Sequence, residues 1–348
     1  MNALKFSLDP VSGTLTERDA KRYFSVFGFA VFALVAGLQL GGLLLSYLVG
    51  RFAPWMFSNA LIYQALSLIP LYGIGVPLCL WVLARLPKDS VLPEKMEGKS
   101  VVKGFCVAVA LMTVGNYLSN IIISFFAAAK GEMLTNPVES MTEGNAWWIN
   151  LIFVALLPAI LEELVFRKLL CDRLLPLGEG YAIVLSAAAF GLVHGNFFQF
   201  AYAFFLGALF SLIYVKTGKL IYSIVYHFLI NLLGGVLMAW LAQRLAPLLN
   251  EETLNRLMEL MTSGDAEAVS ALMGEYLQPL TILAVYEIAM TVMAICGVIF
   301  LVSGLKKTRL QSGLLPPPRE GRVANVFCNA GVAVAITAFA AVFVLSVL

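Results

Sequence analysis

Residues 156–167 read Leu156-Leu157-Pro158-Ala159-Ile160-Leu161-Glu162-Glu163-Leu164-Val165-Phe166-Arg167. Two adjacent carboxylates and one arginine lie inside an otherwise apolar run. Ionisable groups at membrane depth cost roughly 2.5–3.5 kcal/mol each on insertion scales, so this cluster indicates a function. On a helix, Glu163 and Arg167 share a face, whereas Glu162 points about 100° away. We therefore expect Glu163 to be paired and structural, and Glu162 to be free for chemistry.

The composition of the whole chain indicates a membrane protein. Of its 348 residues 60% are hydrophobic and 13% are charged, and the mean hydropathy is +0.88. These values exclude a soluble globular protein. The net charge is only +2, and the basic residues form short clusters at the ends of apolar runs, so the sequence shows no nucleic-acid-binding surface. Five scattered cysteines without a CxxC pair indicate neither a disulfide framework nor a cysteine metal site.

The apolar runs predict an all-α, polytopic membrane helix bundle with about nine transmembrane helices. Basic clusters alternate with acidic loops on the side that the positive-inside rule requires when the N-terminus is cytoplasmic and the C-terminus extracytoplasmic. We expect an integral protein of a bacterial plasma membrane. The apolar runs lie near 24–49, 60–84, 101–127, 147–167, 181–195, 199–215, 219–242, 280–303 and 325–348.

Four regions follow from these runs. Residues 1–146 hold a cytoplasmic segment and three transmembrane helices, and 147–242 form a core of four helices that contains the carboxylates. Residues 243–279 are an acidic, amphipathic extracytoplasmic insert, and 280–348 hold two more transmembrane helices. Within the insert, 250–278 has the spacing of a helical hairpin with a turn at Ser263-Gly264-Asp265. It either binds a protein partner or covers the outer mouth, or it lies on the lipid headgroups.

The only two histidines of the chain, His194 and His227, both lie in apolar runs after the carboxylates. A lone histidine in a helix is usually a core residue, but two histidines confined to the membrane favour catalysis, metal binding or proton relay. Asn231 follows His227 by one helical turn, so both polar tips can donate to one developing oxyanion. Phe190 precedes His194 by the same interval and places an aromatic ring beside that imidazole.

Three motifs on successive helices resemble a known pattern: Glu-Glu-x-x-x-Arg at 162–167, Phe-x-x-x-His at 190–194 and His-x-x-x-Asn at 227–231. In this order they resemble the CAAX-processing and bacteriocin-processing (CPBP, or Abi) family of intramembrane proteases. That family includes the type II CAAX prenyl endopeptidases. The resemblance covers about residues 147–242, and the flanking helices and the insert lie outside it.

The resemblance implies hydrolysis of a peptide bond inside the membrane. Glu162 would be the general base for a water that His194 helps to orient, and His227 with Asn231 would form the oxyanion hole. Glu163, Arg167 and Phe190 would support them. The substrate would be a peptide or a lipidated protein with a CAAX-type or leader-like segment. Zinc could bind Glu162, His194 and His227, but the HExxH helix motif is absent, and we favour a reaction without a metal.

Two other functions use the same residues. A non-catalytic membrane scaffold or bacteriocin-immunity factor would bind a partner through the same cavity. A proton-coupled transporter would use Glu162 and the histidines as a relay. The transporter is disfavoured because the sequence lacks paired interrupted helices in two corresponding halves.

Overall fold

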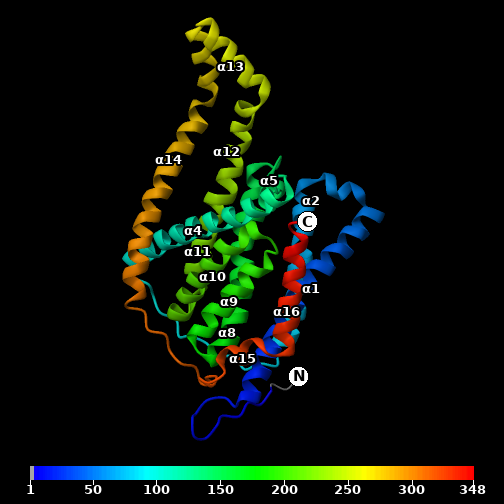
Figure 1. Ribbon diagram of the computed structural model, residues 1–348, viewed down its shortest axis with the longest axis vertical. Coiled ribbons are helices and arrows are strands. Elements are labelled where there is room, and N and C mark those ends of the chain that lie inside the picture. Colours follow the sequence, from blue (N-terminus) through cyan, green and yellow to red (C-terminus); the bar gives the residue numbers. More distant parts are fainter. Residues whose placement is uncertain (1–3) are drawn as a thin grey trace.

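The computed structural model describes residues 4–348 and shows a bundle of helices (Figure 1). Within that range no strand occurs, only two isolated β-bridges. Seven helices are long and apolar enough to cross a membrane. They are α1 (Glu17–Phe52), α2–α3 (Ala60–Leu83), α4 (Gly98–Lys130), the helix Trp147–Leu177, α10 (Phe197–Thr217), the helix Leu220–Leu248 and α14 (Ala266–Leu305).

The all-α membrane bundle is confirmed, but the number of full-length spans is smaller than the predicted nine. Two of the predicted spans are shorter apolar helices, α9 (Glu179–Val193) and α16 (Ala330–Leu345). Glycines with positive φ, Gly178 and Gly195, bound α9 and limit it to 15 residues. At 1.5 Å per residue α9 is about 22 Å long, less than the ~30 Å hydrocarbon thickness. Its ends therefore rely on neighbouring helices for shelter.

Three of the long helices contain π-helical turns. These turns are η2 (Ile69–Gly75), η3 (Leu151–Leu156), η4 (Leu164–Cys171) and η6 (Leu232–Leu237). The parts around them are α2 (Ala60–Leu68), α3 (Val76–Leu83), α6 (Trp147–Asn150), α7 (Leu157–Glu163), α8 (Asp172–Leu174), α11 (Leu220–Asn231) and α12 (Met238–Leu245). Pro70 lies in η2, and Pro158 lies in the first turn of α7; a proline cannot donate the backbone hydrogen bond of a helix. Such turns are frequent at functional sites, and η3, η4 and η6 adjoin the predicted site residues.

Asparagine side chains cap the N-termini of several helices. Asn59, Asn196, Asn250 and Asn329 each accept a backbone N–H in the first turn of the following helix. This satisfies donors that would otherwise be unpaired. The remaining helices are short: α5 (Pro137–Thr142), α13 (Glu251–Ser263), α15 (Arg322–Phe327) and the 3₁₀ turns η1 (Pro54–Ser58), η5 (Leu175–Leu177) and η7 (Ala246–Leu249).

The helices pack in two groups on either side of the carboxylate helix. On one side α1 packs against α16 and α2–α3, and on the other α9, α10, α4 and α14 pack in sequence (Figure 1). The helix α7 packs against α11, which also contacts α10 and α4. Two buried hydrophobic clusters result, one around α1, α9 and η4, the other between α4, α10, α11 and α14.

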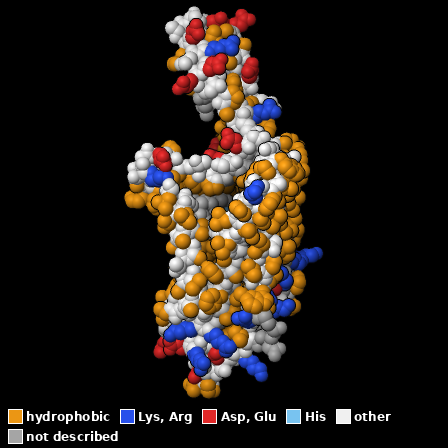
Figure 2. Space-filling view, turned by 90° about the vertical axis from the view of Figure 1, so that its right-hand side faces the viewer, with side chains coloured by type: hydrophobic (Ala, Val, Ile, Leu, Met, Phe, Trp, Pro, Cys, Tyr) orange, Lys and Arg blue, Asp and Glu red, His pale blue; other side chains and the backbone are white. Residues whose placement is uncertain are grey.

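Figure 2 shows apolar side chains over the middle of the bundle and lysines and arginines towards the end that holds α15 and the N-terminal segment. At the opposite end α13 and the first part of α14 protrude as an acidic hairpin, with its turn at Gly264. The predicted hairpin is therefore present, although its second helix continues unbroken into the membrane-spanning part. At 40 residues α14 is about 60 Å long, twice the ~30 Å hydrocarbon thickness, so the hairpin extends well beyond the bundle.

The contact between α1 and α16 predicts an effect of adding one methyl group. A Cβ on Gly28 would collide with the backbone of Gly331 and Val332. Small residues permit such close packing of membrane helices. We expect Gly28→Ala to lower stability by about 1–3 kcal/mol through overpacking. The measurement is thermal unfolding in detergent. The control is Gly274→Ala in α14, where a Cβ meets open space and the better helix former should leave stability equal or higher. Unchanged unfolding of Gly28→Ala would contradict this packing.

Candidate active site

The centre of the site is a buried ion pair between Glu163 and Arg167. Arg167 Nη2 donates to Glu163 Oε1 at 3.1 Å, and Arg167 Nε lies 2.9 Å from Oε2 as a charge contact without hydrogen-bond alignment. Both side chains are 0% exposed. The guanidinium carbon also lies over the rings of Phe190 and Phe210, at 4.8 and 5.7 Å from their centroids. The pairing predicted from i,i+4 spacing is therefore present, and two aromatic faces enclose the cation.

His227 extends this ion pair towards the second carboxylate. Its Nδ1 lies 3.1 Å from Glu163 Oε1, and its Nε2 lies 3.7 Å from Glu162 Oε2. Because the ion-paired carboxylate accepts, Nδ1 carries the hydrogen and Nε2 points towards Glu162. Four ionisable side chains thus form one chain of contacts, in the order Arg167, Glu163, His227, Glu162.

The two carboxylates differ in environment, as predicted. The side chain of Glu163 is 0% exposed and contacts both Arg167 and His227. The side chain of Glu162 is 15% exposed, and its one ion-pair contact among the described residues is with Nε2 of His227 at 3.7 Å. Glu162 is therefore the carboxylate that a water or a substrate can reach.

His194 lies at the end of α9, one helical turn after Phe190. Its Nδ1 lies 2.8 Å from the carbonyl oxygen of Phe190 and must donate to it, since a carbonyl only accepts. In the neutral ring Nε2 is then a free acceptor. The Phe190 ring makes edge contacts with both imidazoles, at centroid distances of 5.2 Å to His194 and 5.7 Å to His227. The predicted aromatic ring beside His194 is present, and the same ring also contacts His227.

Asn231 is less free than predicted. Its Nδ2 donates to the carbonyl oxygen of Val154 in η3, at 3.0 Å, which occupies one of its two amide hydrogens. The bond joins α11 to the carboxylate helix where a π turn leaves a carbonyl available. One amide hydrogen remains for a ligand.

Two supporting residues were missed in the sequence. Ser186 accepts from Arg167 Nη1 at 3.3 Å and donates to the carbonyl oxygen of Phe166 at 2.6 Å. It lies four residues before Phe190 on α9, so extending the Phe-x-x-x-His spacing by one turn would have found it. Phe210, which stacks on His227 at 5.7 Å, carries no comparable signal in the sequence.

A turn of polar side chains holds the end of α9. Asn196 Nδ2 donates to the carbonyl oxygen of His194 at 2.7 Å and to Gln199 Oε1 at 3.0 Å. Gln199 in turn donates to the hydroxyl of Tyr202 at 3.1 Å. Because Gly195 has positive φ and Asn196 caps α10, this turn sets the position of His194 between two helices.

The donor set does not fit a metal ion in this geometry. Across residues 4–348 no group of three His, Cys, Asp or Glu side chains is arranged to hold one. Glu162, His194 and His227, the three ligands considered from the sequence, therefore do not form such a group, although Nε2 of His227 points towards Glu162 at 3.7 Å.

A membrane-spanning helix bundle with a linked arginine, two carboxylates and two imidazoles has the features of a membrane-embedded hydrolase. Comparison with known families agrees. Residues 144–233 match the family described as type II CAAX prenyl endopeptidase Rce1-like, and all seven predicted site residues lie in that segment. Residues 144–233 are therefore similar to the Rce1-like type II CAAX prenyl endopeptidases.

One curated relative supports the same family. The chain is 25% identical over 205 residues to the membrane-embedded CAAX protease MroQ of Staphylococcus aureus (strain USA300). The match covers 53% of this chain and 83% of that protein. No solved structure matches the chain significantly.

The buried ion pair predicts strong coupling between two substitutions. Arg167→Met leaves Glu163 buried with its charge uncompensated, and we expect a loss of about 3–5 kcal/mol of stability. Adding Glu163→Gln removes that charge, so the double variant should be more stable than Arg167→Met alone. Thermal unfolding of both single variants and the double variant measures the coupling. Additive losses would show that the two side chains do not interact.

Proposed function

We propose that the protein is an intramembrane endopeptidase in which Glu162 activates a water to hydrolyse a peptide bond. The observation that carries the proposal is the linked chain from Arg167 to Glu162. In this chain Glu163 holds His227, and Glu162 remains the carboxylate that water or a substrate can reach. The Rce1-like segment and the similarity to a CAAX protease support the reaction class.

In this mechanism Glu162 takes a proton from water while the oxygen attacks the scissile carbonyl carbon. The free Nε2 of His194 accepts a hydrogen bond from that water and orients it. The tetrahedral oxyanion receives the remaining amide hydrogen of Asn231, and Nε2–H of His227 when that ring is doubly protonated. Glu162 then gives its proton to the leaving amine. Glu163 and Arg167 hold His227 and do not contact the substrate.

The proposed substrate is a membrane-associated peptide or protein. It has a CAAX-type or leader-like segment, lipidated or not, that is cut close to the bilayer. The CAAX type is supported by the relative, which is described as a CAAX protease. We also propose that the N-terminus is cytoplasmic and the C-terminus extracytoplasmic. The gathering of basic side chains at the α15 end, opposite the acidic hairpin, supports this orientation (Figure 2).

Replacement of the proposed base tests this function directly. Glu162→Gln keeps the size of the side chain but cannot take a proton, so we expect cleavage to fall by about 10²–10⁴-fold with normal unfolding. The assay compares peptide products released from a membrane proteome by wild type and variant. Glu287→Gln, a carboxylate on α14 outside the Rce1-like segment, is the matched control and should remain fully active. Wild-type rates from Glu162→Gln would refute the assignment.

A reaction without a metal ion predicts that the activity does not depend on zinc. Because the donor groups do not converge on one point, we expect activity to survive treatment with a strong zinc chelator. Elemental analysis of the active preparation should show much less than one zinc per chain. Loss of activity on chelation, restored by added zinc, would show instead that Glu162, His194 and His227 rearrange around a metal.

A further inference from the structure

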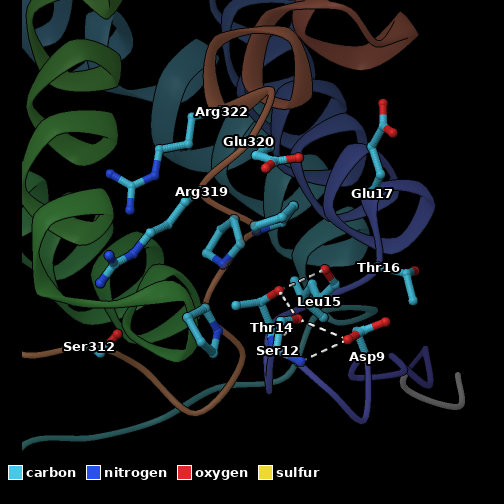
Figure 3. A pocket seen from close by; sticks show the side chains of 13 residues that line it. Asp9, Ser12, Thr14, Leu15, Thr16, Glu17, Ser312, Arg319, Glu320 and Arg322 are labelled. Carbon is cyan, nitrogen blue, oxygen red and sulfur yellow. Dashed lines mark hydrogen bonds between the residues drawn. The ribbon is translucent and has the colours of Figure 1, made fainter.

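A cavity of about 860 Å³ lies where the N-terminal segment meets the segment before α15 (Figure 3). The two segments are joined there, since Leu15 donates its backbone N–H to the carbonyl oxygen of Pro316 at 2.8 Å. The cavity is lined by Asp9, Ser12, Thr14, Leu15, Thr16, Glu17, Ser312, Pro316, Pro317, Pro318, Arg319, Glu320 and Arg322. It lies at the basic end of the bundle, where the apolar surface stops (Figures 1 and 2).

The charges around this cavity are divided into two sides. Arg319 and Arg322 extend in the same direction, Asp9 and Glu17 lie opposite, and Glu320 lies between them (Figure 3). Neither arginine makes an ion pair with the residues that the structure describes, and the same holds for Glu320. The lining is thus polar and rich in donors, with both signs of charge present.

The two opposite carboxylates are already engaged. Asp9 accepts hydrogen bonds from the backbone N–H groups of Ser12 and Val11 and from the Ser12 hydroxyl. These bonds lower the pKa of Asp9, and the bond from the Ser12 backbone has the largest effect. Glu17 pairs with Lys21 at 2.6 Å. The groups left for a ligand are therefore two guanidiniums and one carboxylate, that of Glu320.

An apolar crevice of about 110 Å³ lies between α1, α9, α15 and α16. Each of the three long walls contributes residues at i, i+3, i+4 and i+7. These are Phe24, Phe27, Gly28 and Val31 of α1, Leu185, Ala188, Ala189 and Leu192 of α9, and Val332, Ala335, Ile336 and Phe339 of α16, with Val326 and Phe327 of α15 and no polar side chain.

The cavity and the crevice follow one another along the same helix faces. On α1, Glu17 lines the cavity and Phe24, two turns later, lines the crevice. On α15, Arg322 lines the cavity and Val326, one turn later, lines the crevice. Seven residues of helix span about 10 Å, so a charged hollow lies roughly that far from an apolar one. This is the shape of a phospholipid, with a headgroup next to an acyl chain.

We propose that this composite site binds one phosphatidylethanolamine. Its phosphate lies between Arg319 and Arg322, its primary ammonium faces Glu320, and one acyl chain enters the crevice between α9 and α16. Guanidinium groups suit phosphate because their donors match its oxygens. A purely anionic headgroup would leave Glu320 without a counter-charge beside two further carboxylates. The lipid would hold α15 and α16 against α1 and α9.

The test measures lipid retained by the full-length protein. Protein is exchanged into mixed micelles with equimolar phosphatidylethanolamine and phosphatidylglycerol, and native mass spectrometry counts the bound lipids. We expect one phosphatidylethanolamine per chain. Arg319→Gln with Arg322→Gln should reduce retention about tenfold, the change expected for losing charge-assisted hydrogen bonds. The control, Lys306→Gln with Lys307→Gln, changes two basic residues that line neither hollow and should retain the lipid.

Two further variants test the headgroup and the chain separately. Glu320→Gln should lose the preference for phosphatidylethanolamine over phosphatidylglycerol while keeping a bound phospholipid. Ala188→Phe should fill the crevice and abolish retention, whereas Val184→Phe, on an exposed part of the same helix, should not. Wild-type protein that retains no phospholipid, or prefers phosphatidylglycerol, would overturn the proposal. Equal retention by the double arginine variant would overturn it as well.

Discussion

The contact on which the site depends is the buried ion pair between Arg167 and Glu163. A charge in a membrane-spanning bundle is tolerated only when it is paired, and here each partner also has a second role. The arginine covers the face of Phe190, and the glutamate turns His227 towards Glu162. The ion pair is therefore linked through His227 to the second carboxylate, that of Glu162. This explains why two adjacent glutamates on one helix have different environments.

The helices around this pair are irregular close to the candidate site. π turns in the carboxylate helix and in the helix that follows His227 depart from α-helical hydrogen bonding, and one of them presents the Val154 carbonyl to Asn231. The short helix α9 ends inside the bundle, so His194 lies at a turn fixed by Asn196. Irregular backbone at membrane depth is stable only when protein covers it. Here the surrounding helices provide that cover.

The rest of the chain supports the Rce1-like segment from both sides. The N-terminal segment and the linker before α15 meet at the basic end, where Glu179 also accepts from Lys216 and from the backbone of Gln311. These bonds connect the first and last helices to the core, although α16 is too short to span by itself. The proposed lipid site belongs to the same junction. The acidic hairpin, in contrast, extends away from the bundle and shares no residue with the site.

The sequence by itself determined the fold class, the approximate place of each apolar helix and the pairing of Glu163 with Arg167, although α14 begins 14 residues before its predicted run. Apolar run length and i,i+4 spacing are local properties: the first predicted the helices, and the second correctly paired Glu163 with Arg167. Only the tertiary structure decided which groups meet across helices: His227 with Glu163, Asn231 with the Val154 carbonyl, and the ring of Phe190 with His227. It also decided that α9 and α16 fall short of full spans. The reason is that helix rotation, π turns and backbone approach at glycines depend on packing partners far apart in the chain, which no local pattern encodes.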